Sequence, residues 1–164
     1  MANRKIPSEL ERALVAFEAG ALDKIIERKR SEDFEALRRL VSLEPSVNPD
    51  HRQRAIYALG RWGDSSVVPS VVKMLPSLKE SHCITALEAL GRLGTKDACA
   101  AIESFADNPS PQIRKFVVEA LYRIGSPAAE AKLRKMANED SEGWVRDLVA
   151  KRMKALTENA AGYR

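Results

Sequence analysis

"YALGRWGD" at residues 57–64 returns as "EALGRLGT" at 88–95 and as "EALYRIGS" at 119–126. The three copies start at residues 57, 88 and 119, so each start lies 31 residues after the one before it. A fixed period of about 20–50 residues is typical of proteins built from stacked structural units, each of which buries its apolar face against its neighbours. The chain is therefore expected to be a repeat array.

Two adjacent columns of the repeat mark where one helix ends and the next begins. The first column is glycine and follows an apolar stretch, which fits the left-handed residue that commonly ends a helix. The second column holds side chains that accept hydrogen bonds from the free amides of a new helix. The columns are Gly63, Gly94 and Gly125, and then Asp64, Thr95 and Ser126, with Asp33 one period earlier.

A second set of capping residues divides each unit into two helices, called A and B here. Proline follows two of these caps at the first helical position, where it fits well. The second unit lacks a cap in this column, and Ser77 with Glu80 offers a capping box in its place. Between the caps, apolar residues recur with the i, i+3, i+4 spacing of a helix buried on one face. The caps are Asn48, Ser110 and Ser141, and the prolines are Pro49 and Pro111.

These patterns predict an all-α array of about four helical hairpins in one domain. Residues 1–30 carry apolar residues at helical spacing and are expected to cap the array as one or two helices, because the end of a stack exposes an apolar face. Residues 158–164 are expected to form a flexible tail. The four units are placed at 31–63, 64–94, 95–125 and 126–157.

Composition limits the classes of function. Lys and Arg total 27 against 23 for Asp and Glu, a mild positive excess that permits an acidic partner without requiring one. No apolar run approaches the roughly 20 residues that cross a bilayer, and the N-terminal stretch lacks the apolar core of a secretory signal. Cys83 and Cys99 occupy unmatched repeat positions, which favours reduced thiols over a disulfide framework. The sequence thus predicts a cytoplasmic protein with no membrane partner.

The repeated phrases resemble HEAT repeats, in particular the short HEAT-like type of the phycobilisome lyases. The resemblance rests on "ALGRWGD", "ALGRLGT" and "ALYRIGS" with the A-helix stretches that follow them, and on "DNPSPQIRKFVVEAL" at 107–121. It covers about 31–157 and implies a right-handed α-solenoid whose B helices line the concave inner surface. The family includes interaction scaffolds, chromophore lyases, an iron hydroxylase and DNA glycosylases of related build, so the resemblance implies a fold and no single activity.

The resemblance also implies a polar ladder between adjacent units. In such repeats the Asp of the turn between helices A and B and the Arg early in helix B connect neighbouring units by hydrogen bonds. Carried over to this chain, the pattern concerns Asp107 with Arg114 and Asp140 with Arg146. The second unit has Cys83 at the Arg position, so the ladder is expected to be interrupted there.

The strongest candidate for a binding site is a row of four cations near the ends of the B helices, called the basic row below. Stacked units would place its members side by side, about 10 Å apart, along one edge of the inner surface. Such a row could hold an acidic segment of a partner protein or successive phosphates. A purely structural explanation also exists, because a cation in the last turn of a helix offsets the negative end of the helix dipole. The basic row is Arg61, Arg92, Arg123 and Lys154.

Other exposed B-helix positions are expected beside the basic row. Tyr and Arg are common anchors at protein interfaces, and their mixture with Glu favours a protein partner over a phosphate backbone. The two tyrosines could equally be half-buried packing residues, and Trp144, which opens the last B helix, is either a capping contact or an exposed anchor. The candidate positions are Arg54, Tyr57, Glu88, Lys115, Glu119 and Tyr122.

Metal and catalytic chemistry have little support. His51 and His82 share a column, but no carboxylate is repeated beside them, so both are expected to be surface residues at helix starts. Cys99 lies on an apolar stripe, and no His–Asp pair is placed to activate Cys83. We expect no metal, no cofactor and no enzymatic activity. The favoured function is a protein–protein interaction scaffold, the alternative is a nucleic-acid or polyanion binder, and a chromophore-lyase-like activity is less favoured.

Overall fold

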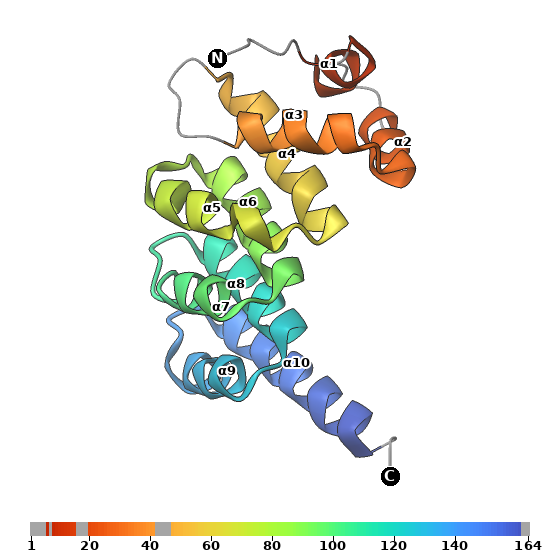
Figure 1. The fold of residues 1–164 in the computed structure, drawn as a ribbon. Helices are drawn as coiled ribbons and strands as arrows, with labels where there is room; N and C mark the ends of the chain where they lie inside the picture. The colour runs from red at the N-terminus through yellow and green to blue at the C-terminus, as the bar shows by residue number, and fades with distance from the viewer. Residues whose placement is uncertain (1–5, 7, 16–19, 42–46, 162–164) are drawn as a thin grey trace.

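The structure is a computed structural model that describes residues 6, 8–15, 20–41 and 47–161. This part of the chain is all-α and contains no strand (Figure 1). Two short 3-10 helices, η1 (Ser65–Val67) and η2 (Leu75–Ser77), flank α5. The α-helices are α1 (Ser8–Val15), α2 (Ala21–Arg28), α3 (Ser31–Leu40), α4 (Pro49–Trp62), α5 (Val68–Met74), α6 (Glu80–Leu93), α7 (Lys96–Glu103), α8 (Pro111–Ile124), α9 (Pro127–Glu139) and α10 (Gly143–Ala161).

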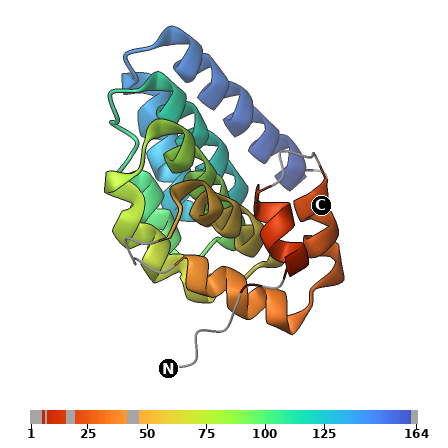
Figure 2. The ribbon, with the colours of Figure 1, turned by 90° about the horizontal axis from the view of Figure 1, so that it is seen from above.

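The helices stack as an α-solenoid, which Figure 1 shows from the side and Figure 2 along the stack. The B helices α4, α6, α8 and α10 follow one another, and each contacts the next. The A helices α5, α7 and α9 form a second row in which each contacts the next, while α3 packs against α4. Each A helix also packs against the B helix that follows it. Positions one period apart therefore lie on neighbouring helices of the stack.

Glycine allows the close approach of the first three B helices. A Cβ atom placed on Gly60 of α4 would lie 2.7 Å from the Cβ atom of Ala89 on α6. One period later, a Cβ atom on Gly91 would lie 2.8 Å from the Cβ atom of Ala120 on α8. Both distances are too short for real carbon atoms, so a larger residue would push the helices apart. The third residue in this column is Tyr122, and α8 meets α10 through this large side chain.

Most of the predicted helix ends are present. Gly63, Gly94 and Gly125 follow α4, α6 and α8 with φ angles of 79°, 61° and 59°, the left-handed conformation that glycine adopts without strain. Several helices then begin where a side-chain oxygen accepts a backbone N–H bond. These capping residues are Asn48, Asp64, Thr95, Ser110 and Ser126.

Three predicted caps are wrong. Asp33 lies within the first turn of α3, where it is buried and its Oδ2 atom has no hydrogen-bond partner among the described residues. Ser77 donates its hydroxyl to the carbonyl of Met74 and does not cap α6. Ser141 does not start α10, because the carbonyl of Glu142 accepts the first backbone bonds of that helix. Serine and aspartate side chains can bond to several nearby backbone groups, so sequence alone does not decide which bond forms.

The helices α1 and α2 cover the first B helix, α4, against which both pack. Arg54 of α4 donates to the carbonyl of Leu14 in α1. The indole N–H of Trp62 donates to the carbonyl of Ile26 in α2 at 2.5 Å. The Trp62 ring also stacks on Phe34 of α3, with ring centroids 4.8 Å apart. These contacts fix the N-terminal helices on the apolar end of the stack.

The last B helix is longer than the others, with 19 residues in α10 against 14 in α8. Residues 158–161, which the sequence analysis places in the tail, belong to this helix, while 162–164 lie outside the described residues. The stretch "TENAA" contains no Pro or Gly to stop the helix earlier. Within the described part of the chain, no helix combines the length and the apolar character needed to cross a membrane.

Candidate functional site

The four members of the basic row lie on the four stacked B helices. Arg61, Arg92 and Arg123 are in the last turns of α4, α6 and α8. Lys154 lies further from the end of its helix, because α10 continues to Ala161. Compensation of the helix dipole, which acts within the last turn, therefore accounts for the three arginines and not for Lys154.

Tyr57 lies between the first two members of the basic row. The guanidinium groups of Arg61 and Arg92 lie 5.8 and 5.9 Å from the centre of its ring, distances at which an aromatic face attracts a cation. Arg61 also donates to the Tyr57 hydroxyl at 3.0 Å, and Asp23 of α2 lies 3.8 Å from Arg61. The ring thus connects α4 with α6, and Asp23 lowers the net charge at this end of the row.

The other end of the basic row faces solvent. Arg123 is exposed and makes no ion pair with any described residue. Lys154 is exposed, and among the described residues it pairs only with Glu158 of its own helix, at 3.7 Å. Solvent weakens such a pair strongly. Arg123 and Lys154 are therefore open to a partner, and Arg61 is also exposed but lies beside Tyr57 and Asp23.

Glu119 and Tyr122 of α8 hold Arg152 of α10. The guanidinium of Arg152 donates to Glu119 at 2.7 Å and lies 5.2 Å from the centre of the Tyr122 ring. All three side chains are half-buried. The hydrogen bond to Glu119 raises the pKa of Arg152 above its ordinary value. These two candidate residues thus form part of the contact between the last two B helices.

The remaining candidates differ in their surroundings. Arg54 binds the N-terminal helix α1, as described above. Glu88 is half-buried on α6. Lys115 is half-buried on α8, and its ammonium lies 5.3 Å from the ring centre of Phe116. Sequence reasoning identified these positions as B-helix residues but could not identify their partners, because long side chains reach groups that are distant in the chain.

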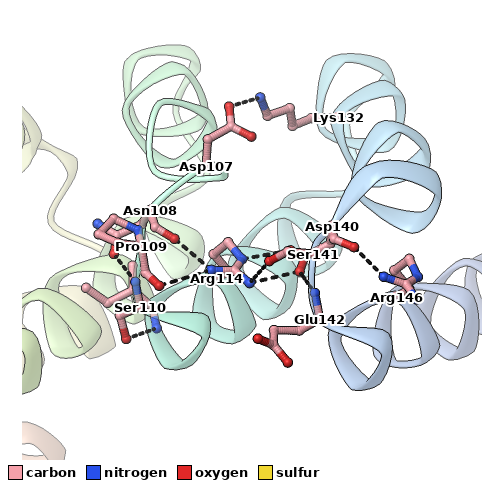
Figure 3. Close-up of polar contacts among 11 residues, drawn as sticks. Asp107, Asn108, Pro109, Ser110, Arg114, Lys132, Asp140, Ser141, Glu142 and Arg146 are labelled. Carbon is pink, nitrogen blue, oxygen red and sulfur yellow. Dashed lines mark hydrogen bonds and ion pairs between the residues drawn. The ribbon is translucent and has the colours of Figure 1, made fainter.

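Arg114 and Asp140 form a two-pronged ion pair between α8 and the turn before α10 (Figure 3). The Nε and Nη2 atoms of Arg114 donate to the two carboxylate oxygens at 2.8 and 2.9 Å, and Nη1 donates to the carbonyl of Asn108 at 2.8 Å. Both ionic side chains are buried. Burial acts to raise the pKa of Asp140, but bonds from Arg114 and from the backbone N–H of Glu142 outweigh it and hold the pKa below its usual value.

The pairing in this ladder differs from the one implied by the family resemblance. Arg114 bonds forward to Asp140, whereas Asp107 pairs with Lys132 of α9 at 3.7 Å. Arg146 donates to the backbone carbonyl of Asp140 and not to its carboxylate. This difference has a geometric reason. Stacking places the turn between α9 and α10 beside the start of α8, so Arg114 reaches the carboxylate of Asp140 in that turn (Figure 3).

A second ionic link was not identified from the sequence. Arg38 of α3 donates to the carboxylate of Asp64 at 2.6 and 3.2 Å, and Asp64 also accepts the backbone N–H of Ser66. Burial acts to raise the pKa of Asp64, but these bonds outweigh it and hold the pKa below its usual value. Asp64 belongs to a predicted capping column, but nothing in the repeat pattern signals its second role as the partner of Arg38.

The histidines and cysteines form no group of potential metal ligands within the described residues. His82 is buried, contrary to the expectation of a surface position, and its Nε2 atom lies 3.0 Å from Asp50. Burial raises the pKa of Cys83 to about 11 and also raises the pKa of Cys99. Both thiols are therefore protonated at neutral pH, which makes them poor nucleophiles.

A groove of about 480 Å³ lies between the N-terminal halves of α8 and α10. Its walls are mainly apolar, and Trp144, one of its lining residues, is 42% exposed. The sequence predicts Lys115 as a candidate position and leaves two roles open for Trp144, but nothing in the repeat pattern connects these two residues. The groove residues are Gln112, Lys115, Trp144, Asp147, Leu148 and Lys151.

Comparison with known proteins identifies repeats in this chain. Residues 77–154 match the family model of HEAT repeats. Among proteins with curated functions, no sequence matches. The fold is similar to a solved structure, the complex of CpcE and CpcF of phycocyanin lyase from Nostoc sp. PCC7120. That likeness has a TM-score of 0.64 and 22% sequence identity, and it covers 96% of this chain and 68% of the other.

Proposed function

We propose that this chain, whose residues 77–154 match HEAT repeats, works as a non-catalytic protein–protein interaction scaffold that binds its partner across the B helices. Units that contact only their neighbours produce an extended surface without any active-site constellation. The proposed module consists of units 31–63, 64–94, 95–125 and 126–157, with residues 1–30 as its N-terminal cap. The proposed binding surface is its inner, concave side.

The observation that carries the proposal is the pair of open charges on adjacent B helices. Arg123 on α8 and Lys154 on α10 face solvent, whereas Arg61, which is also exposed, and Arg92 both pack against the Tyr57 ring. Side chains that are already ordered lose little freedom when a partner binds, and Arg and Tyr are common anchors at interfaces. This arrangement supports a protein partner that presents carboxylates.

The state of the thiols supports a non-catalytic role. Cys83 and Cys99 are buried, free and protonated at neutral pH, so the proposal includes no covalent step, cofactor or metal. Free thiols also fit a reducing compartment, and we place the protein in the cytoplasm. A chromophore-lyase-like activity is the less favoured alternative, because 22% identity to a lyase structure supports a shared fold alone.

Binding of nucleic acid or another polyanion to the basic row is the second candidate function. The positive charges at successive helices favour it. Carboxylates near the basic row disfavour nucleic-acid binding. Asp23 lies near Arg61, and Glu88 stands four residues before Arg92 on α6. The two functions differ in their dependence on salt, because neutralising several phosphates releases counterions and makes affinity fall steeply as salt rises.

A comparison of baits in the native host tests the proposal. Wild-type protein is compared with the double variant Arg123→Glu, Lys154→Glu, and with the charge-matched control Lys73→Glu, Lys96→Glu on the A helices. We expect a partner protein that binds wild type and control, and that binds the first variant at least about tenfold more weakly in a titration with purified components. Circular dichroism of all three proteins checks that the fold is intact.

Two results would contradict this expectation. If nucleic acid is captured in place of protein, with affinity that falls steeply with salt, the alternative is correct. If all three baits bind the same partner equally, Arg123 and Lys154 do not contact the partner and the proposed binding surface is wrong.

A further inference from the structure

The groove between α8 and α10 exists because these two helices pack differently from the earlier B helices. Gly60 and Gly91 let α4, α6 and α8 approach until their backbones nearly touch. Tyr122 stands at the next position of that column, and with Arg152 it fills part of the space between α8 and α10. Nearer the N-terminal ends of both helices, the space of about 480 Å³ is left open.

The groove presents an exposed aromatic side chain on an apolar wall. Trp144 is 42% exposed, and Leu148, one turn further along α10, is half-buried beside it. Among the described residues, Val15 on α1 is the other large hydrophobic residue with comparable exposure. An exposed tryptophan beside other apolar surface is typical of interface anchors. The space admits one or two side chains, which points to a short segment as the occupant.

Charge around the groove selects the chemistry of that segment. Lys115 from α8 and Lys151 from α10 line the groove, and Asp147 is the single carboxylate among its lining residues. Glu119, one turn beyond Lys115, is already paired with Arg152 at 2.7 Å. The basic row continues the positive charge along the same two helices. An occupant with carboxylates on both sides of an apolar residue is complementary to this pattern.

Two polar contacts hold the groove in one shape before anything binds. Near its N-terminal end, Arg114 bonds to Asp140 and to the hydroxyl of Ser141 at 3.1 Å (Figure 3). One turn beyond Lys115, Arg152 bonds to Glu119. A site that is formed in advance avoids the cost of ordering the helices during binding.

We propose that this groove binds a short acidic segment of a partner protein, whose apolar side chain packs against Trp144 while flanking carboxylates face Lys115 and Lys151. The inference rests on the proposed interaction function and gives it one position and one chemistry. It does not require that the basic row contact the partner.

An NMR titration with synthetic peptides tests the site directly. The probe is a capped peptide with a central phenylalanine between glutamate pairs, and the controls replace phenylalanine by serine or the glutamates by lysines. We expect the probe alone to shift the indole N–H signal of Trp144. The indole N–H of Trp62 donates to the carbonyl of Ile26 and serves as an internal control that stays in place.

Variants separate the apolar and ionic contributions. With a fluorescently labelled probe, the variant Lys115→Glu, Lys151→Glu is expected to bind about tenfold more weakly. Trp144→Ala, which removes the anchor, is expected to abolish measurable binding. The charge-matched control Lys73→Glu, Lys96→Glu is expected to bind like wild type, because both lysines lie on A helices.

Three outcomes would overturn the inference. They are no Trp144 shift at millimolar probe, equal shifts with all three peptides, and a Trp144 signal that moves with protein concentration alone, which would mean that a second copy fills the groove. Failure of the groove inference can be distinguished from failure of the proposed function. If only the groove inference is wrong, a captured partner binds Trp144→Ala as tightly as wild type. If the proposed function is wrong, no bait captures a protein, and the peptide titration still shows whether the groove binds an acidic segment.

Discussion

Arg114 and Asp140 are 26 residues apart in the chain, yet two nitrogens of one lie 2.8 and 2.9 Å from the two carboxylate oxygens of the other (Figure 3). The pair is buried, and the third nitrogen of the guanidinium donates to the carbonyl of Asn108. The contact thus satisfies buried polar groups of two turns at once and joins the last two hairpins. It also lies beside one end of the α8–α10 groove.

Removing Arg114 is expected to destabilise the protein. Arg114→Ala leaves the buried carboxylate of Asp140 without its charged partner, a change that costs about 3 kcal/mol. Urea unfolding followed by circular dichroism measures the loss. The control is Arg134→Ala, which breaks an exposed pair with Glu130 and should have little effect. Equal stability of the two variants would mean that the ladder contributes nothing to the stack.

Stability is expected to fall with acid. The pKa values of Asp64 and Asp140 lie below their ordinary value of 3.8 in the folded protein. Carboxylates of this kind stabilise the fold fully above 3.8, and the contribution disappears as pH falls through the lowered values. Unfolding measured between about pH 2 and pH 7 should show this loss. Asp140→Asn should be less stable at neutral pH and less sensitive to acid, and an unchanged acid slope in this variant would contradict the argument.

A methyl group at Gly91 is expected to separate α6 from α8. The added Cβ atom would meet the Cβ and Cα atoms of Ala120 at 2.8 and 2.9 Å. Although alanine favours a helix more than glycine does, overpacking should dominate and Gly91→Ala should lower stability by about 1–3 kcal/mol. In the control Gly143→Ala, the nearest atom is the end of the flexible Arg146 side chain at 3.6 Å, so thermal unfolding should change little or improve.

Loss of the indole at Trp62 is expected to loosen the N-terminal helices. Trp62→Phe keeps a ring to stack on Phe34 but removes the hydrogen bond to the carbonyl of Ile26. Hydrogen exchange should therefore accelerate in α1 and α2, while α8 and α10 keep their protection. A uniform increase along the whole chain would show that the first hairpin and its covering helices are not a separate opening unit.

The candidate site was only partly predictable. The 31-residue columns correctly placed Arg61, Arg92 and Arg123 at the ends of successive B helices, because capping and periodicity are local signals. The same columns did not indicate that Tyr57 lies between two of these arginines. Such contacts depend on how far a side chain reaches across the stack. A repeat column indicates on which helix and helix face a residue lies, but not which residue it contacts.

Two further details show where the repeat pattern ends. Asp33 stands in a capping column, yet α3 begins two residues earlier, at Ser31, and Asp33 is buried within its first turn. The helix α3 packs against α4 but has no A helix before it in the stack. Lys154 stands in the column of the arginines, yet α10 continues past it to Ala161. Terminal units have a neighbour on one side only, so their geometry departs from that of the middle units.

The sequence by itself determined that this protein is a stack of helical hairpins, because the period, the glycine turns and the apolar spacing act over one or two helical turns and need no distant contact. Only the tertiary structure decided which charges are neutralised, as with Glu119 by Arg152, and which stay open, as at Arg123. It alone also formed the groove beside Trp144. Electrostatic and packing contacts depend on distances in space, and the ion pairs of Arg114 with Asp140 and of Arg152 with Glu119 join residues more than 25 positions apart in the chain.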